Sequence, residues 1–188
     1  RKNNIEKGGE QRKFNTHFYN GLSLKSLENF EEALEEFKKC IDFNSENPVP
    51  YYESAIIYKL FGQVESALEY SKKAYYLSKE NIWYQLLYAE LLATNGYSVK
   101  ASIIYKQLIK KHPGNEEYYL LLADNYIYDR KFSEAIKIYN QLEKHKGVDK
   151  NIIIQKQKLY IENNDLKGAI TEIKKLIEVD NTDLQAYE

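Results

Sequence analysis

Small and large apolar residues recur along this chain at one fixed spacing. Alanine stands at Ala33, Ala67, Ala101, Ala135 and Ala169, so each step is 34 residues long. Four further series keep the same register: Gly21, Ala55, Ala89, Ala123; Leu24, Tyr58, Leu92, Tyr126, Tyr160; Phe37, Ser71, Tyr105, Tyr139, Ile173; and Cys40, Ala74, Leu108, Leu142, Leu176. Agreement among these series predicts a repeated structural unit.

The spacing inside each unit is that of an α-helix. Ala33, Phe37 and Cys40 are separated by four and three residues, which places them on one helix face. A polar turn such as the one at Gly62 divides each unit in two, because glycine readily adopts the left-handed conformation that ends a helix. Proline between units, as at Pro48, suits the start of the next helix. Each unit is therefore expected to be a pair of antiparallel helices.

Five such pairs fit the chain. The first helices are expected near 14–27, 48–61, 82–95, 116–129 and 150–163, and the second helices near 31–44, 65–78, 99–112, 133–146 and 167–180. The units span 14–47, 48–81, 82–115, 116–149 and 150–183, with a turn at Asn181 and a truncated sixth unit from residue 184. Residues 1–13 are polar, contain a Gly-Gly pair and are expected to form a flexible leader.

The small residues explain how such pairs would stack. Glycine or alanine at a helix crossing lets two axes approach to about 8–10 Å, and the larger residues fill the space between neighbouring pairs. One pair alone has too little apolar surface to be stable, so the pairs are expected to pack on one another. The alternative is one long coiled coil, but the apolar positions keep no heptad and Gly and Pro interrupt the pattern.

The period and the order of small and aromatic positions resemble tetratricopeptide repeats. The segments YYESAIIYKLFGQVESALEYSKKAYYLSKEN and YYLLLADNYIYDRKFSEAIKIYNQLEK carry the pattern, and the resemblance covers about residues 14–188. The fifth unit departs from it, because Gln157 stands where a small residue is expected. The resemblance implies the fold class: all-α, a right-handed α-solenoid of about five helix-turn-helix units plus the start of a sixth.

A narrower resemblance concerns the setting of the protein. The run of repeats, including QKQKLYIENNDLKGAI, looks like that of tetratricopeptide lipoproteins of the bacterial cell envelope, some of which serve protein secretion and gliding machinery. This resemblance implies the periplasmic face of a bacterial envelope, with the cytoplasm as the alternative. The sequence starts with Arg1 rather than Met, so a targeting peptide ahead of it would not be seen.

The resemblance to tetratricopeptide repeats also implies a binding surface. In such stacks the first helices line a concave groove that holds a partner protein or peptide. By register, the groove residues here are Phe18, Leu22, Tyr52, Ile56, Lys59, Trp83, Leu86, Glu90, Glu117, Leu120, Asp124, Tyr128, Ile154 and Lys158. The only tryptophan, Trp83, is a favoured anchor because it buries a large area with few rotors. The alternative is that some of these residues are core, or are covered by the leader or by further repeats.

Three of these groove residues are charged and stand at 34-residue steps: Glu90, Asp124 and Lys158. They are expected to form a charged stripe across the groove. One hypothesis is that Glu90 and Asp124 meet a lysine or arginine of the ligand. The alternative is that Lys158 pairs with Asp124 and that the remaining charge is solvated.

The charge of the whole chain argues against a nucleic-acid partner. The formal net charge is -1 and the pI is about 6.4, so no excess of basic residues attracts a polyanion. A lysine series on the second helices is offset by nearby glutamates and is expected to be solvated surface; its members are Lys38, Lys72, Lys106 and Lys174. No run of about 18 apolar residues occurs, so no membrane span is expected in this segment.

No residue constellation for catalysis stands out. Cys40 is the only cysteine and falls in a core series, so a buried, inert thiol is expected. His17, His112 and His145 lack the spacing of metal ligands. We therefore expect no catalytic residues, no metal site and no cofactor. The leading hypothesis is a scaffold or adaptor that binds a partner protein or peptide; the alternatives are a lipoprotein assembly factor of an envelope secretion or gliding machine and, less favoured, a domain of an enzyme.

Overall fold

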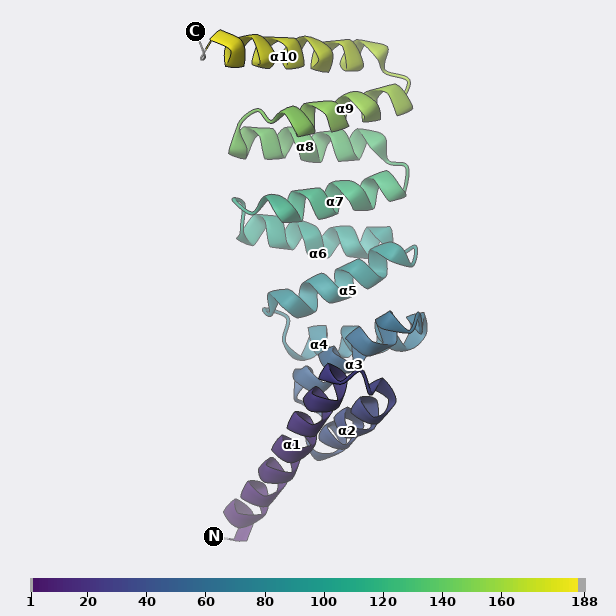
Figure 1. The fold of residues 1–188 in the computed structure, drawn as a ribbon, viewed down its shortest axis with the longest axis vertical. Helices are drawn as coiled ribbons and strands as arrows, with labels where there is room; N and C mark the ends of the chain where they lie inside the picture. The colour runs from purple at the N-terminus through teal and green to yellow at the C-terminus, as the bar shows by residue number, and fades with distance from the viewer. Residues whose placement is uncertain (1, 186–188) are drawn as a thin grey trace. The chain divides into compact units, whose positions relative to one another are not determined.

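The computed structural model describes the backbone of residues 2–185 and the side chains of residues 9–179. Every regular element of this part of the chain is an α-helix (Figure 1). The helices are α1 (Lys2–Ser26), α2 (Phe30–Phe43), α3 (Pro48–Leu60), α4 (Val64–Leu77), α5 (Ile82–Thr94), α6 (Ser98–Lys111), α7 (Glu116–Tyr128), α8 (Phe132–Lys146), α9 (Lys150–Glu162) and α10 (Leu166–Gln185).

The contacts divide the chain into two compact units, Arg1–Asn95 and Gly96–Glu188, which we call unit 1 and unit 2. In unit 1, each helix from α1 to α5 packs against the next one along the chain. In unit 2, the helices from α6 to α10 do the same. The predicted pairs of antiparallel helices are therefore present, with bounds from Phe30 to Glu162 that lie within one residue of the expected ones.

The alanines that define the period occupy equivalent buried sites. Ala33, Ala67, Ala101 and Ala135 have no exposed surface, and Ala169 has almost none. Gly21 shows why a small residue is needed in the facing helix, because a Cβ atom built there would lie 2.7 Å from Cε1 of the buried Phe37. In the last pair Gly168 has this role, since Tyr160 packs directly on it.

Each repeat also carries two local signals that hold its turns. Inside the repeats, the turn residue has a positive φ, and these residues are again 34 apart: Glu28, Gly62, Gly96, Arg130 and Asn164. Between repeats, an Asn or Asp side chain accepts a hydrogen bond from a backbone N–H in the first turn of the following helix; these caps are Asn47, Asn81, Asn115 and Asp149. Such caps satisfy backbone donors that the helix itself leaves free.

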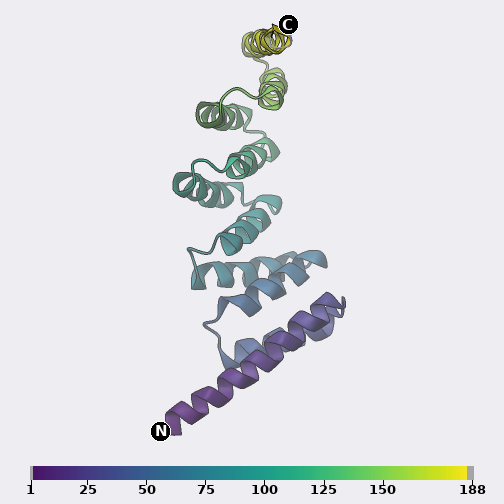
Figure 2. The ribbon, with the colours of Figure 1, turned by 60° about the vertical axis from the view of Figure 1, so that its left-hand side comes forward.

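The structure corrects the predicted leader. Residues 2–13 are not a separate coil but the first half of α1, which extends past the end of α2 (Figure 2). Lys, Glu, Gln and Arg dominate this stretch and are good helix formers, and no proline interrupts it. The side chain of Gln11 donates to Oδ1 of Asn15 one turn later at 2.9 Å, and the buried ring of Phe14 anchors the helix to its neighbours.

The structure also corrects the end of the fifth unit. The turn expected at Asn181 is absent, and α10 continues through it to Gln185. After Gly168 the helix contains neither glycine nor proline, so no residue there favours its termination. Residues 184 and 185 of the predicted sixth unit therefore extend α10, and residues 186–188 lie outside the described part of the chain.

Candidate functional site

The groove residues predicted for unit 1 come from α1, α3 and α5, and we call them the unit 1 surface. They are Phe18, Leu22, Tyr52, Ile56, Lys59, Trp83, Leu86 and Glu90. Two ion pairs join the three helices that carry them. Nζ of Lys25 on α1 lies 2.6 Å from Oε2 of Glu53 on α3, and Nζ of Lys59 on α3 lies 2.5 Å from Oε1 of Glu90 on α5. The first helices of unit 1 are therefore adjacent, and ion pairs connect them.

Four of the apolar residues of the unit 1 surface are partly core. Phe18 and Leu22 pack against the buried residues Ala33, Phe37 and Ile57. Tyr52 and Ile56 pack against the buried cluster of Ala55, Ala67, Leu87 and Leu91. For these side chains the alternative of a core role holds in part, since only a fraction of each remains open to a ligand.

Tyr52 has an additional aromatic neighbour. Its ring centroid lies 5.0 Å from that of Tyr84, one helix further along. Burial raises the pKa of both phenols, so both hydroxyls stay neutral at physiological pH. Tyr52 is thus held in place by packing and is half-buried.

Trp83 differs from its neighbours on this surface because its side chain is 67% exposed. Its backbone N–H donates to Oδ1 of Asn81 at 2.9 Å, which fixes it in the first turn of α5. Within the described residues, its ring has no stacking or cationic partner and its indole N–H has no hydrogen bond. Leu86 and Glu90 follow at three and seven residues, so they share the helix face of Trp83.

The ion pair of Glu90 bears on the charged stripe. Glu90 was expected either to meet a cationic ligand or to be solvated, and in the structure Lys59 already neutralises it. Both partners remain about half exposed, so a competing ligand reaches them from solvent. Lys25 and Lys59 are 34 residues apart, and each forms an ion pair with a glutamate of the next first helix. This spacing is the sequence signal that would have indicated the ion pairs.

The groove residues predicted for unit 2 lie on α7 and α9 and form the unit 2 surface: Glu117, Leu120, Asp124, Tyr128, Ile154 and Lys158. Tyr128 is 70% exposed, Glu117, Asp124 and Lys158 are exposed, and Leu120 and Ile154 are half-buried. In the described part of the chain, no ion pair joins Lys158 to Asp124. The surrounding protein removes water from Asp124 and raises the pKa of its carboxyl, although the side chain is accessible.

Sequence reasoning missed a buried charge cluster in unit 2. Lys156 on α9 is wholly buried and pairs with Glu143 of α8 and Glu172 of α10. Lys175 of α10 also reaches Glu172. Because Lys156 and Glu172 are buried where α8, α9 and α10 meet, we assign the cluster to packing of the last helices rather than to a binding site.

The cysteine and histidines occupy separate places. Cys40 is fully buried, burial raises the pKa of its thiol to about 11, and its S–H donates to the carbonyl of Phe14 at 3.6 Å. Nδ1 of His17 lies 2.8 Å from Oε2 of Glu36. The described residues contain no group of three or more His, Cys, Asp or Glu side chains arranged to hold a metal ion. Within the described helices none combines the length and apolar character that crossing a bilayer requires.

Comparison with known proteins gives one family match and several structural neighbours. Residues 21–47 match the family model described as "Tetratricopeptide repeat". MamA from Desulfovibrio magneticus RS-1 has a TM-score of 0.70 and 16% identity, over 90% of this chain and 96% of that one. YrrB, described as a TPR protein with an unusual peptide-binding site, has a TM-score of 0.69 and 15% identity, over 87% of this chain and 84% of that one.

One curated relative is the DnaJ homolog subfamily C member 3 of Gallus gallus, which is 22% identical over 182 residues. The match covers 89% of this chain but 36% of the relative, so the chain spans about a third of the length of that protein. The predicted all-α solenoid of helix pairs and the resemblance to tetratricopeptide repeats are confirmed by these comparisons together with the helices described above, except for the start of a sixth unit. The comparisons do not test the narrower resemblance to envelope lipoproteins.

Proposed function

The chain is folded as tetratricopeptide repeats, and we propose that it is a protein-interaction scaffold whose unit 1 surface binds a segment of a partner protein. The supporting observation is the exposed, unpartnered ring of Trp83, which shares one face of α5 with the half-buried Leu86. A tryptophan left open to water in a folded chain is a typical anchor for a partner, because few other side chains bury as much area.

The energetics favour Trp83 as the main contributor. Full burial of a large apolar side chain stabilises a complex by about 1.5–3 kcal/mol. The other apolar residues of the unit 1 surface are already half-buried, so a partner removes less of their area from water. Association itself costs roughly 4–15 kcal/mol, more than Trp83 alone offsets, so the partner must also cover the other apolar residues of the unit 1 surface, and we expect a modest affinity.

The unit 2 surface, taken by itself, favours a basic segment. Asp124 has no counter-ion among the described residues, and the exposed ring of Tyr128 lies one helical turn away. A lysine or arginine of the partner gains an ion pair with Asp124 and a cation–π contact with Tyr128. Glu90, which stands in the same register, is less available because Lys59 already pairs with it.

The neighbour YrrB is described as having a peptide-binding site, which supports a binding role for the same fold here. Because the chain spans only part of the DnaJ homolog, that relative gives no partner for this protein. A role as an envelope lipoprotein stays a prediction from the sequence resemblance alone.

The proposal is tested by photo-crosslinking from position 83. A photoreactive phenylalanine analogue replaces Trp83 in one variant and the exposed Glu31, on a second helix of the same unit, in a control variant. We expect a discrete crosslinked partner, identified by mass spectrometry, from position 83 and not from position 31. Equal crosslinking from both positions, or none from position 83, contradicts binding at the unit 1 surface.

A further inference from the structure

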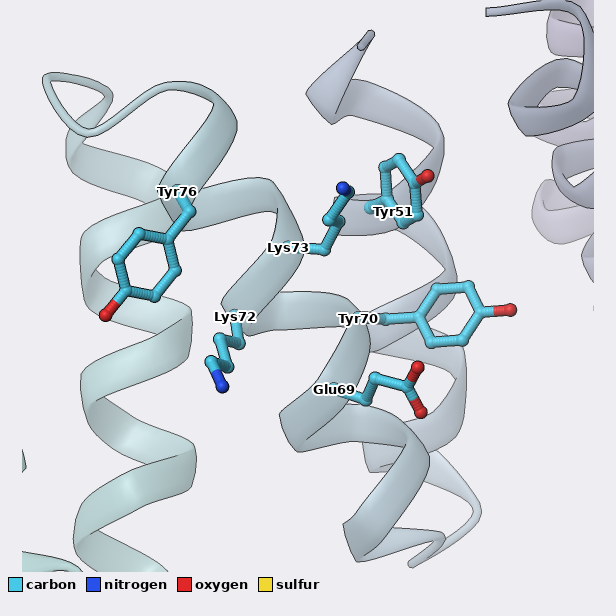
Figure 3. Close-up of a pocket in the computed structure, with 6 residues that line it drawn as sticks. All are labelled: Tyr51, Glu69, Tyr70, Lys72, Lys73 and Tyr76. Atoms are coloured by element: carbon cyan, nitrogen blue, oxygen red, sulfur yellow. The ribbon is translucent and has the colours of Figure 1, made fainter. Parts of the chain in front are cut away.

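Unit 1 has a cavity on α3 and α4 that is separate from the unit 1 surface. Its volume is about 420 Å³, and it is lined by Tyr51, Glu69, Tyr70, Lys72, Lys73 and Tyr76 (Figure 3). None of these residues belongs to the predicted groove. We call it the outer pocket. Its volume falls within the range of about 300–1,000 Å³ that is usual for ligand-binding pockets.

Aromatic rings form the apolar part of the outer pocket. The ring centroids of Tyr51 and Tyr70 are 5.8 Å apart, and Tyr58 packs behind Tyr70 at 5.1 Å. Burial and the neighbouring Tyr58 raise the pKa of Tyr70 to about 12, so its hydroxyl is a neutral donor. Tyr76 is about half exposed at the far side of α4. The rings are therefore held by packing and present fixed faces to a ligand.

Two lysines supply positive charge to this pocket. Neither Lys72 nor Lys73 forms an ion pair with any described residue. In Figure 3, Lys73 extends toward Tyr51, and its Nζ lies 6.0 Å from the centre of that ring. Glu69 is the single acidic residue of the lining, which leaves the pocket with one net positive charge. A smaller cavity of about 180 Å³ shares Tyr70 and adds Lys38 and Glu35 to the same side of the unit.

We infer that the outer pocket binds an acidic segment of a partner protein, with carboxylates on Lys72 and Lys73 and apolar side chains on Tyr51 and Tyr70. The unpaired ammonium groups select an anion, and the rings select a ligand with apolar stems. Glu69 disfavours a densely charged polyanion such as nucleic acid, because it repels closely spaced phosphates. A cavity of this size holds one or two side chains of an extended peptide and not a folded domain.

The test uses a fluorescein-labelled synthetic peptide in which glutamates alternate with leucines, and a matched peptide with glutamine in place of each glutamate. Fluorescence anisotropy with the full chain is expected to show binding of the acidic peptide only. The double variant Lys72→Gln/Lys73→Gln is expected to weaken this binding by roughly tenfold or more, since each exposed ion pair contributes a factor of a few. The variant Lys106→Gln is the control, because it is in the register of Lys72 but does not line the outer pocket.

Both lysines are exposed and unpaired, so the double variant is expected to keep its fold, which circular dichroism checks. Equal binding of the glutamine peptide, or equal weakening by Lys106→Gln, overturns the inference. Single-stranded DNA is the competing ligand. If the DNA displaces the acidic peptide from the natural chain, and the double variant no longer binds the DNA, the pocket is a nucleic-acid site and the inference is overturned. Trp83→Ala is expected to leave the acidic peptide bound, which separates this pocket from the unit 1 surface.

Discussion

Nζ of Lys156 lies 2.7 Å from Oε2 of Glu143 and is wholly buried between α8, α9 and α10. The same Nζ is 3.0 Å from Oε1 of Glu172, and Lys175 reaches that oxygen at 3.1 Å. The second oxygens of the two glutamates are buried without a hydrogen-bond partner. The last three helices thus meet around a charged cluster that is balanced in charge but only partly satisfied in hydrogen bonds.

Removing the lysine alone is expected to destabilise unit 2 strongly. Lys156→Met leaves two buried carboxylates without their central counter-ion, and such losses cost about 3–5 kcal/mol. Urea unfolding followed by circular dichroism measures the change. Lys158→Met, on the same helix but exposed, is the control and is expected to change the free energy of unfolding by less than about 0.5 kcal/mol.

Replacing the whole cluster is expected to have a different result. The triple variant Lys156→Met/Glu143→Leu/Glu172→Leu removes the buried charges together, and such replacements are often neutral or stabilising. It is therefore expected to recover most of the stability lost in Lys156→Met. A triple variant less stable than the single variant contradicts an electrostatic origin of the loss.

The turn of the fourth repeat offers a stabilising substitution. Arg130 has a φ of 54°, in the left-handed region where Gly62 and Gly96 stand in the same register. In this region a non-glycine residue destabilises the folded state by roughly 1–2 kcal/mol. Glycine avoids this strain, but the greater entropy of the unfolded chain costs about 0.5–1 kcal/mol. Arg130→Gly is therefore expected to raise the free energy of unfolding by about 0.5–1 kcal/mol. Gly62→Ala is the opposite change and is expected to lower it by about 1 kcal/mol; thermal and urea unfolding measure both.

The buried thiol of Cys40 predicts a loss of stability in alkali. Burial raises its pKa from 9.0 to about 11, so the folded state holds the proton more tightly than the unfolded state. This contribution is fully present below pH 9 and is lost as the pH rises from 9 toward 11. Cys40→Ala removes the titrating group, and alanine fits because Ala74 stands at the equivalent buried site.

Urea unfolding of both proteins across this pH range measures the effect. The natural chain is expected to lose more stability than Cys40→Ala between pH 9 and 11. The buried tyrosines Tyr70 and Tyr139, whose pKa values are about 12, act on both proteins alike. An identical pH dependence of the two proteins contradicts the role given to Cys40.

Trp83 is both the expected anchor and the chain's only indole, so it reports on its own environment. Its emission is expected to be that of a water-exposed tryptophan in the free chain and to shift to shorter wavelength when a partner binds. Trp83→Ala is expected to weaken the partner's affinity at least about tenfold. Val99→Ala, at an exposed residue on a second helix, is the matched control; an unchanged affinity of Trp83→Ala removes the residue from the site.

The sequence by itself determined the helices and their order. Ala33, Ala67 and Ala101 repeat because every unit needs a small residue at the same buried crossing, and that need is visible as a period. The turns repeat for a similar local reason, since Gly62 and Asn81 act on backbone groups within a few residues of themselves. The leader was misjudged because a polar helix such as α1 has no apolar period to reveal it.

Tertiary structure alone decided which predicted site residues are free. The sequence predicts both Trp83 and Tyr52 as groove residues. In the structure Trp83 is exposed, whereas Tyr52 packs against a buried cluster. Glu90 and Lys59, or Lys156 and Glu143, form ion pairs only when separate helices pack side by side. An ion pair depends on distances of a few ångströms. The 34-residue period predicts which residue faces the neighbouring helix, but it does not predict which side chain of that helix lies within reach.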